Sequence, residues 1–216
     1  MNLLKRWKDQ LIALTKQTNI CKICFKKFES INHKAEICQN CYNKFECIYE
    51  NWKICNIDIL AIYRYNNFFK SLIFQFKGCY DIELRNVFLE KQLPFLKMKY
   101  FGYYIVCIPS SLEDDKKRGF NHVEEIFKLL NLNYINVLRK KFAFKQSDLP
   151  KKEREKIIDK LEVIDGFKIK DKKILLVDDI LTTGSSIKSA IRLITKYHPK
   201  DIKVLVLAHN CRKNRQ

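Results

Sequence analysis

Four runs of the chain are almost continuously apolar, and three of them end in a carboxylate, a histidine or a proline. They are Asp58–Tyr65, Tyr103–Pro109, Lys172–Asp179 and Asp201–His209. Their length and their β-branched content predict buried β-strands. Strands that are apolar on both faces are typical of a parallel sheet covered on both sides.

Between these strands lie segments whose apolar residues recur with helical spacing. We expect helices at Phe68–Lys77, Asp81–Gln92, His122–Asn131 and Ser185–His198. Strands that alternate with helices indicate an α/β fold with a parallel sheet.

Two further regions have other patterns. Met1–Leu14 carries apolar residues interrupted by charges, which predicts a short amphipathic helix rather than a signal peptide or a membrane span. Arg139–Asp159 is highly charged and weakly periodic, which predicts a mobile loop. We therefore expect neither a secretory nor an integral membrane protein, and we place the chain in the cytoplasm.

The cysteines are clustered near the start of the chain. There are nine, an odd number, and Cys21, Cys24, Cys38 and Cys41 form two C-x2-C pairs. Two such pairs can supply four thiolates at tetrahedral corners, the arrangement that Zn²⁺ prefers in structural sites. We expect a structural zinc module in residues 1–56 and a larger domain in residues 57–216. His33 is expected to be exposed rather than a ligand, and the packing residues are expected to include Cys47, Cys55, Cys79 and Cys107.

The composition is that of a folded protein with an unusual excess of positive charge. The 216 residues are 47% hydrophobic, and the formal net charge is +18. Such a charge favours a polyanionic partner, such as nucleic acid, a phosphorylated substrate or an acidic membrane surface. A lysine-rich solvated surface without a specific partner is the equally weighted alternative.

The stretch VDDILTTGSS, residues 177–186, combines two kinds of binding chemistry. Asp178 and Asp179 end a strand, where open parallel sheets bind ligands. Thr182, Thr183, Gly184 and Ser185 then lead into a helix, whose N-terminal N–H groups favour an anion. Carboxylates suit sugar hydroxyls or a Mg²⁺ shell, so the pattern predicts a ribose 5-phosphate site.

Other phosphate-binding motifs and folds fit this stretch poorly. A dinucleotide-binding turn needs several glycines, and a P-loop needs Gly-Lys-Ser/Thr, whereas only Gly184 is present. A receiver domain would need more chain after Asp179 than remains. A purely structural strand and capped helix is the less favoured alternative.

The same stretch resembles the phosphoribosyl-pyrophosphate (PRPP) motif of type I phosphoribosyltransferases. Together with the four cysteines, the whole chain resembles the ComF family, a competence-associated branch of that superfamily. Further similar segments are FQFKG (74–78), IPSS (108–111), KRGFNH (117–122) and KQSDL with Arg154. Two positions depart from the family pattern: His122 replaces a glutamine, and Ile157 stands where an asparagine is expected.

The resemblance implies a parallel-sheet type I phosphoribosyltransferase-like fold with a small N-terminal zinc-binding module. Asp178 and Asp179 would hold the ribose hydroxyls, and residues 182–185 would hold the 5′-phosphate. Pro109, Ser110 and Ser111 would meet the diphosphate with Mg²⁺, assisted by Arg118, and residues 139–159 would close over the site.

Three functions remain open at this point. The first is a DNA-uptake protein that binds single-stranded DNA and PRPP in the cytoplasm, with helicase or recombination proteins as possible partners. The second is a metabolic phosphoribosyltransferase acting on a base or amine, and the third is a PRPP-sensing adaptor. Aromatic residues would support DNA binding by stacking, although any single one, such as Trp52, Tyr63, Tyr65 or Phe120, more often packs in a core.

Overall fold

The structure is a computed structural model that describes residues 17–31, 35–110, 112–140 and 161–210. The predicted helix at Met1–Leu14, His33, Ser111 and the region of Arg154 and Ile157 lie outside the described residues. Of the predicted mobile loop, only Arg139 and Lys140 are described.

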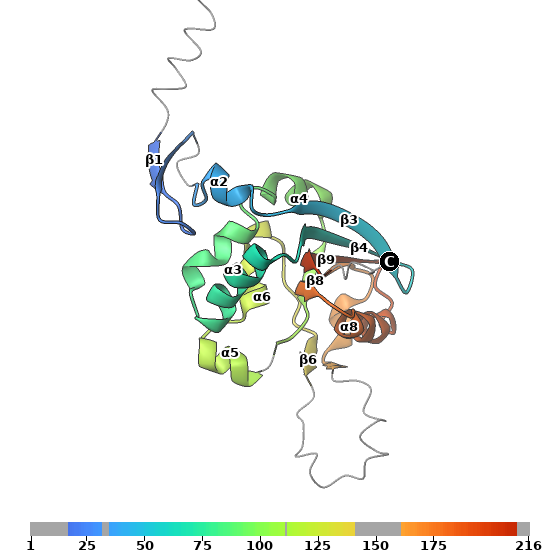
Figure 1. Ribbon diagram of the computed structural model, residues 1–216. Helices are drawn as coiled ribbons and strands as arrows, with labels where there is room; N and C mark the ends of the chain where they lie inside the picture. Colours follow the sequence, from blue (N-terminus) through green and yellow to red (C-terminus); the bar gives the residue numbers. More distant parts are fainter. Residues whose placement is uncertain (1–16, 32–34, 111, 141–160, 211–216) are drawn as a thin grey trace, which may run out of the picture.

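A five-stranded sheet of order β3-β4-β9-β8-β5 forms the centre of the molecule (Figure 1). The strands are β3 (Cys47–Ile54), β4 (Ile57–Arg64), β5 (Tyr104–Cys107), β8 (Lys173–Leu181) and β9 (Asp201–His209). β4, β9, β8 and β5 are parallel, which confirms the four predicted strands and their parallel arrangement. β3 was not predicted, and it adds an antiparallel edge strand that pairs with β4.

Helices cover both faces of this sheet, with α3 and α6 on one side and α8 on the other (Figure 1). The larger helical elements are α3 (Asn67–Gly78), α4 (Leu93–Lys99), α5 (Leu112–Arg118), α6 (His122–Phe127) and α8 (Ser185–Thr195). α3 begins where the Asn66 side chain accepts a hydrogen bond from the Phe69 N–H. This N-cap satisfies one of the N–H groups that a helix start leaves without a partner.

Alternate side chains of β8 enter two separate hydrophobic cores. Leu175 and Val177 pack with the apolar face of α3, and Ile174 and Leu176 pack with that of α8. Alternation along the strand therefore explains why its sequence is apolar without interruption.

Smaller elements complete the described chain. β1 (Gln17–Ile20), β2 (Lys27–Ser30) and α2 (Gln39–Tyr42) form the N-terminal module, and β6 (Leu138–Lys140) pairs with β7 (Leu161–Val163). Three 3₁₀ helices are η1 (Ile82–Phe88), η2 (Lys128–Leu130) and η4 (Gly166–Ile169). Because β3 lies in the main sheet, the sheet includes residues on both sides of the division expected after residue 56. That division remains a prediction.

Two sequence predictions require correction. The helix expected at Asp81–Gln92 is the 3₁₀ helix η1 followed by a turn. Cys47, Cys55 and Cys79 are exposed rather than packed. Cys47 lies on the outward face of an edge strand, and the other two lie in turns, so neighbouring apolar residues did not predict their burial.

Candidate ligand-binding cavity and metal centre

A cavity of about 550 Å³ opens at the carboxyl ends of β5 and β8. The residues that line it include Lys77, Pro109, Ser110, Arg118, His122, Lys140, Asp178, Asp179, Ser185 and Ser186. Its position is the one at which open parallel sheets bind ligands. Its volume lies within the range of small-molecule sites.

Asp179 is the most closely surrounded charge in this cavity. Its Oδ2 accepts hydrogen bonds from Lys77 Nζ at 2.8 Å and from His122 Nε2 at 3.1 Å. Its Oδ1 accepts from the Ile180 N–H at 2.7 Å. Burial alone would raise the pKa of Asp179, but the His122 hydrogen bond and the Lys77 ammonium outweigh it and lower that pKa.

Asp178 experiences the opposite environment. Its Oδ1 accepts a hydrogen bond from the Asp179 N–H at 2.9 Å. Burial and the neighbouring Asp179 carboxylate raise the pKa of Asp178 well above its usual range. The two adjacent carboxylates therefore differ, because Lys77 and His122 stabilise the charged form of Asp179, whereas burial and the Asp179 charge disfavour the charged form of Asp178.

The hydrogen bonds of His122 define its tautomer. Its Nδ1 lies 3.1 Å from Arg118 NH1, and a guanidinium only donates hydrogen bonds. Nδ1 must therefore accept, and the proton sits on Nε2, which donates to Asp179. The glutamine expected at this position from the family pattern offers the same pair of one acceptor and one donor.

Asp115 on α5 organises the other wall of the cavity. Its carboxylate accepts hydrogen bonds from Ser110 Oγ, from Arg118 NH1 at 2.9 Å and from Asn121 Nδ2 at 3.2 Å. Arg118 Nε also donates to the Lys77 carbonyl oxygen at 3.0 Å. Arg118 thus connects α3, α5 and α6, and two of its donor nitrogens are already engaged by the protein.

The loop after β8 turns sharply at Gly184, which has a φ of 72°. A β-carbon at this position would lie 3.2 Å from Ile54 Cδ1 and 3.3 Å from Leu181 Cδ1. Both the positive φ and the close packing therefore favour glycine. The turn starts α8 at Ser185, whose first-turn N–H groups have no partner within the helix and suit an anion.

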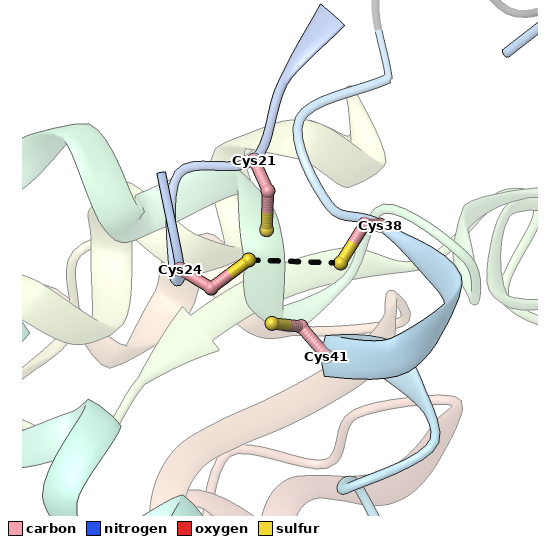
Figure 2. A group of neighbouring side chains, drawn as sticks. All are labelled: Cys21, Cys24, Cys38 and Cys41. Carbon is pink, nitrogen blue, oxygen red and sulfur yellow. Dashed lines mark hydrogen bonds between the residues drawn. The ribbon is translucent and has the colours of Figure 1, made fainter. Parts of the chain in front are cut away.

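The four cysteines of the N-terminal module converge on one point (Figure 2). Their sulfur atoms all lie within 4.8 Å of one another, and Cys24 Sγ is 3.8 Å from Cys38 Sγ. A Zn–S distance of about 2.3 Å places tetrahedral sulfur ligands about 3.8 Å apart. The donor set and its spacing therefore fit a zinc ion.

The protonation of this cluster also suits a cation. Burial acts to raise the pKa of Cys21, but hydrogen bonds from the backbone around Cys38, Cys24 and Ile23 lower it to about 7. The pKa of Cys41 is raised by burial and by the neighbouring sulfurs. A bound cation would offset both the burial and the sulfur–sulfur repulsion.

Comparisons with known proteins agree with this architecture. Residues 117–216 match the phosphoribosyl transferase domain family. The chain is 35% identical to competence protein ComFC of Streptococcus pneumoniae over 147 residues, which are 68% of this chain and 66% of that relative. The chain belongs to the ComF family.

Solved phosphoribosyltransferases show more distant similarity to this ComF-family chain. A hypoxanthine phosphoribosyltransferase from Staphylococcus aureus is 16% identical, with 62% of this chain and 68% of that chain covered and a TM-score of 0.37. A hypoxanthine-guanine phosphoribosyltransferase from Bacillus anthracis is 13% identical, with 63% and 75% covered and a TM-score of 0.39. The family match, the parallel strands and the cysteine cluster establish a type I phosphoribosyltransferase-like fold with an N-terminal four-cysteine module.

The structure brings most of the predicted site residues to one cavity. Pro109, Ser110, Arg118, Asp178, Asp179 and Ser185 line it. Thr182, Thr183 and Gly184 line a smaller adjoining hollow that shares Asp178 and Ser185 with the main cavity. Ser111 lies outside the described residues.

Three charged residues of this site were not individually predicted as functional: Lys77, Asp115 and Lys140, although Lys140 lies in the segment 139–159 that was expected to close over the site. Lys77 lies within the FQFKG segment, so the signal was present, but its pairing with a residue 102 positions later could not be inferred from spacing. Asp115 lies in a charged helix that gives no periodic clue.

The cysteine module of this ComF-family chain is fixed to the main domain by polar contacts. Asn86 Nδ2 donates to Glu36 Oε1 at 2.7 Å, and the Glu36 N–H donates to Glu90 Oε2 at 2.9 Å. Lys22 forms an ion pair with Glu83 on η1. The remaining oxygens, Glu36 Oε2 and Glu90 Oε1, are buried without a hydrogen-bond partner, and burial raises the pKa of Glu90.

Across the described ranges, no helix is both long and apolar enough to cross a membrane.

Proposed function

We propose that this ComF-family chain binds PRPP with Mg²⁺ in the 550 Å³ cavity and binds single-stranded DNA, as a cytoplasmic component of natural DNA uptake. The observation that carries the PRPP proposal is the arrangement at the end of β8. Two carboxylates suited to hydroxyls stand directly before a loop and helix start suited to a phosphate.

Each part of PRPP has a chemical counterpart in the cavity. The 5′-phosphate would occupy the turn at residues 182–185, where backbone N–H groups and hydroxyls surround an anion. The ribose hydroxyls would donate to Asp178 and Asp179. The diphosphate would lie near Pro109, Ser110 and Ser111, with Mg²⁺ neutralising its charge.

The cations of the cavity would serve different purposes. Lys140 lines the cavity, and none of the ion pairs formed among the described residues involves its ammonium, so it would meet the diphosphate. Arg118 would act mainly by positioning, because its hydrogen bonds to Asp115, His122 and the Lys77 carbonyl hold three helices together. Lys77 and His122 would hold Asp179 ionised and oriented.

Phosphoribosyl transfer to a base or amine is the second candidate function, and the match to the phosphoribosyl transferase domain favours it. In such a reaction, the bond from ribose C1 to the diphosphate oxygen breaks as the acceptor nitrogen bonds to C1. Binding positions the two reactants, and charge stabilisation of the leaving diphosphate lowers the barrier. Diphosphate release from PRPP with a panel of bases and amines tests this candidate.

The DNA-binding part of the proposal is supported by the formal charge of +18 and by the family relation to competence protein ComFC. Phosphate contacts make such binding salt-dependent, because each contact releases condensed counterions. Affinity for an oligo-dT strand that does not fall as salt rises would contradict this part.

Calorimetric titration with PRPP, with and without Mg²⁺, tests the PRPP part. The double variant Asp178→Ala/Asp179→Ala is expected to lose PRPP binding while its zinc content, measured by atomic emission, stays at the wild-type level. Cys24→Ser provides the reciprocal control, with reduced zinc content expected. PRPP binding that survives the double aspartate variant would overturn the site assignment.

A further inference from the structure

Two adjoining hollows lie at the end of the sheet opposite the PRPP cavity. One, of about 340 Å³, is lined by Asn51, Trp52, Lys53, Asp58, Lys99, Tyr100, Tyr103 and Lys203, among others. The other, of about 410 Å³, is lined by residues that include Lys97, Phe101, Tyr103, Tyr104 and Asn133. Tyr103 lines both, so the hollows are neighbours, and we call the two together the aromatic–lysine groove.

Lysines lie over the aromatic rings of this groove. Lys172 Nζ is 4.7 Å from the centre of the Tyr104 ring, and Lys173 Nζ is 5.7 Å from that of Tyr103. Lys99 Nζ lies 5.7 Å from the Phe95 ring centre and 5.9 Å from that of Tyr100. Lysine ammonium groups therefore lie at cation–π distances from four aromatic rings in or beside the groove.

The rim of the groove presents aromatic side chains to solvent. Phe101, in the turn after α4, is 82% exposed, the highest value among the large apolar side chains of the described residues. Phe95 on α4 is not part of the lining, but it lies beside the lining residue Lys99, is also exposed, and meets Tyr49 of β3 edge to face, with ring centres 5.8 Å apart. Full burial of such a ring would contribute on the order of 2 kcal/mol, and a stacked base could supply part of that burial.

Positive charge predominates in the groove. Six lysines line it or lie over its rings: Lys53, Lys97, Lys99, Lys172, Lys173 and Lys203. Two carboxylates accompany them, Asp58, which pairs with Lys203 and Lys53, and Asp201, which accepts a hydrogen bond from Tyr103. The ligand that matches this lining is a polyanion that also carries flat rings.

We propose that the aromatic–lysine groove is the surface on which this protein binds single-stranded DNA. Its lysines contact the phosphates, and Phe101 and Phe95 stack against unpaired bases, as sequence-independent binding requires. A duplex keeps its bases stacked on one another and would leave these rings without a partner. This inference rests on the DNA-binding half of the proposed function and adds where the strand lies.

The groove and the PRPP cavity are separated by the length of the sheet. Lys173 begins β8 and Asp179 stands six residues later near its carboxyl end, which corresponds to about 20 Å along the strand. A strand in the groove therefore leaves the cavity open, and DNA and PRPP can be bound at the same time.

The test is fluorescence anisotropy of a labelled 20-residue oligo-dT strand with the full-length protein. Phe101→Ala is expected to weaken binding about tenfold, because stacking contributes roughly 1–3 kcal/mol per base. Phe101→Trp is expected to restore affinity, which a merely structural role for the side chain would not require. Phe74→Ala removes a ring that is 62% exposed on α3, outside the groove, and should bind as the wild type does.

Charge is tested with a pair of matched double variants. Lys97→Ala/Lys99→Ala should lower the slope of log affinity against log salt by about 1.4, since each single-strand phosphate contact contributes about 0.7. Lys70→Ala/Lys196→Ala makes the same change in net charge at two exposed sites away from the groove, and it should leave the slope as in the wild type. PRPP affinity, measured by calorimetric titration, should be the same as in the wild type for all of these Phe101, Phe74, Lys97/Lys99 and Lys70/Lys196 variants.

The outcomes separate this inference from the proposed function. Salt-dependent DNA binding by the wild type that the groove variants retain in full would overturn the groove and leave the proposed function intact. Absence of DNA binding by the wild type would overturn both. Displacement of DNA by saturating PRPP would contradict simultaneous binding of DNA and PRPP. Preferred binding of an oligo-rU strand through the same residues would contradict DNA as the ligand of the groove.

Discussion

Removal of the Lys77 ammonium is expected to destabilise the protein more than removal of the carboxylate it pairs with. Lys77 Nζ lies 2.8 Å from Asp179 Oδ2, and at an effective dielectric constant of about 20 this distance corresponds to roughly 6 kcal/mol of gross attraction. Desolvation and the 35% exposure of the Lys77 side chain reduce the net contribution. We expect Lys77→Met to lower the free energy of unfolding by about 2–3 kcal/mol.

The asymmetry comes from the difference in exposure between the two partners. The Asp179 side chain is only 11% exposed, so water can hydrate its carboxylate only slightly when Lys77 is removed. The hydrogen bond from His122 then remains, but the ammonium charge that balanced the carboxylate is lost. Lys77 can regain water when Asp179 is removed. Burial and, after it, the Asp179 charge raise the pKa of Asp178, and Asp179→Asn removes the second of these causes, so a cost of about 1 kcal/mol or less is expected.

Urea unfolding followed by circular dichroism measures these differences. For Lys77→Met the thermal midpoint should fall by about 5–10 °C, and Lys70→Met on the same helix provides the exposed control. In the double variant Lys77→Met/Asp179→Asn, the two effects should be less than additive. The reasoning is refuted if Lys77→Met costs less than Asp179→Asn, or if the double variant shows no coupling.

Four further results are expected. His122→Gln should keep PRPP affinity within about twofold in calorimetry, because glutamine supplies the same donor and acceptor, whereas His122→Ala should reduce stability by about 1–2 kcal/mol. Gly184→Ala should lower both PRPP affinity and stability, the latter by about 1–2 kcal/mol in urea unfolding, because of its positive φ and close packing. Glu90→Gln should raise the thermal midpoint by about 2–4 °C at pH 7.5, and the gain should shrink toward acid pH. Burial raises the pKa of Glu90 in the folded state, so the wild type loses stability as the pH rises through that pKa. The Glu90→Gln variant has no carboxyl at this position and does not show this loss. Cys38→Ser should lower bound zinc, measured by atomic emission, together with the thermal midpoint, and equal zinc content in variant and wild type would contradict the metal assignment.

Sequence patterns predicted the parts of this protein that are formed by residues close together along the chain. The four parallel strands are continuous apolar runs, and the turn at residues 182–185 carries its own glycine. β3 was missed because an edge strand alternates exposed and half-buried residues, a weaker pattern that lies close to the cysteine pairs. Its one-sided burial also explains why Cys47 was wrongly expected to be packed.

Contacts between distant segments could not be predicted in this way. The ion pair between Lys77 and Asp179 joins residues from α3 and β8, and the aromatic–lysine groove gathers residues from β3, α4, β5, β8 and β9. The net charge predicted a polyanionic partner, but only the folded chain shows where rings and lysines lie together.

The paired carboxylates illustrate how one short motif can hold two residues with different tasks. Asp179 accepts hydrogen bonds from Lys77 and His122, so its negative charge is balanced before any ligand arrives. Asp178 is half-buried beside that charge, and desolvation and the Asp179 carboxylate raise its pKa, so its ionisation is unfavourable until a cation or a hydrogen-bond donor reaches it. A Mg²⁺ ion or a ribose hydroxyl supplies that compensation. The protein therefore balances the charge of Asp179 in advance and leaves that of Asp178 to be balanced by the ligand, so two adjacent acids can both meet a phosphorylated sugar.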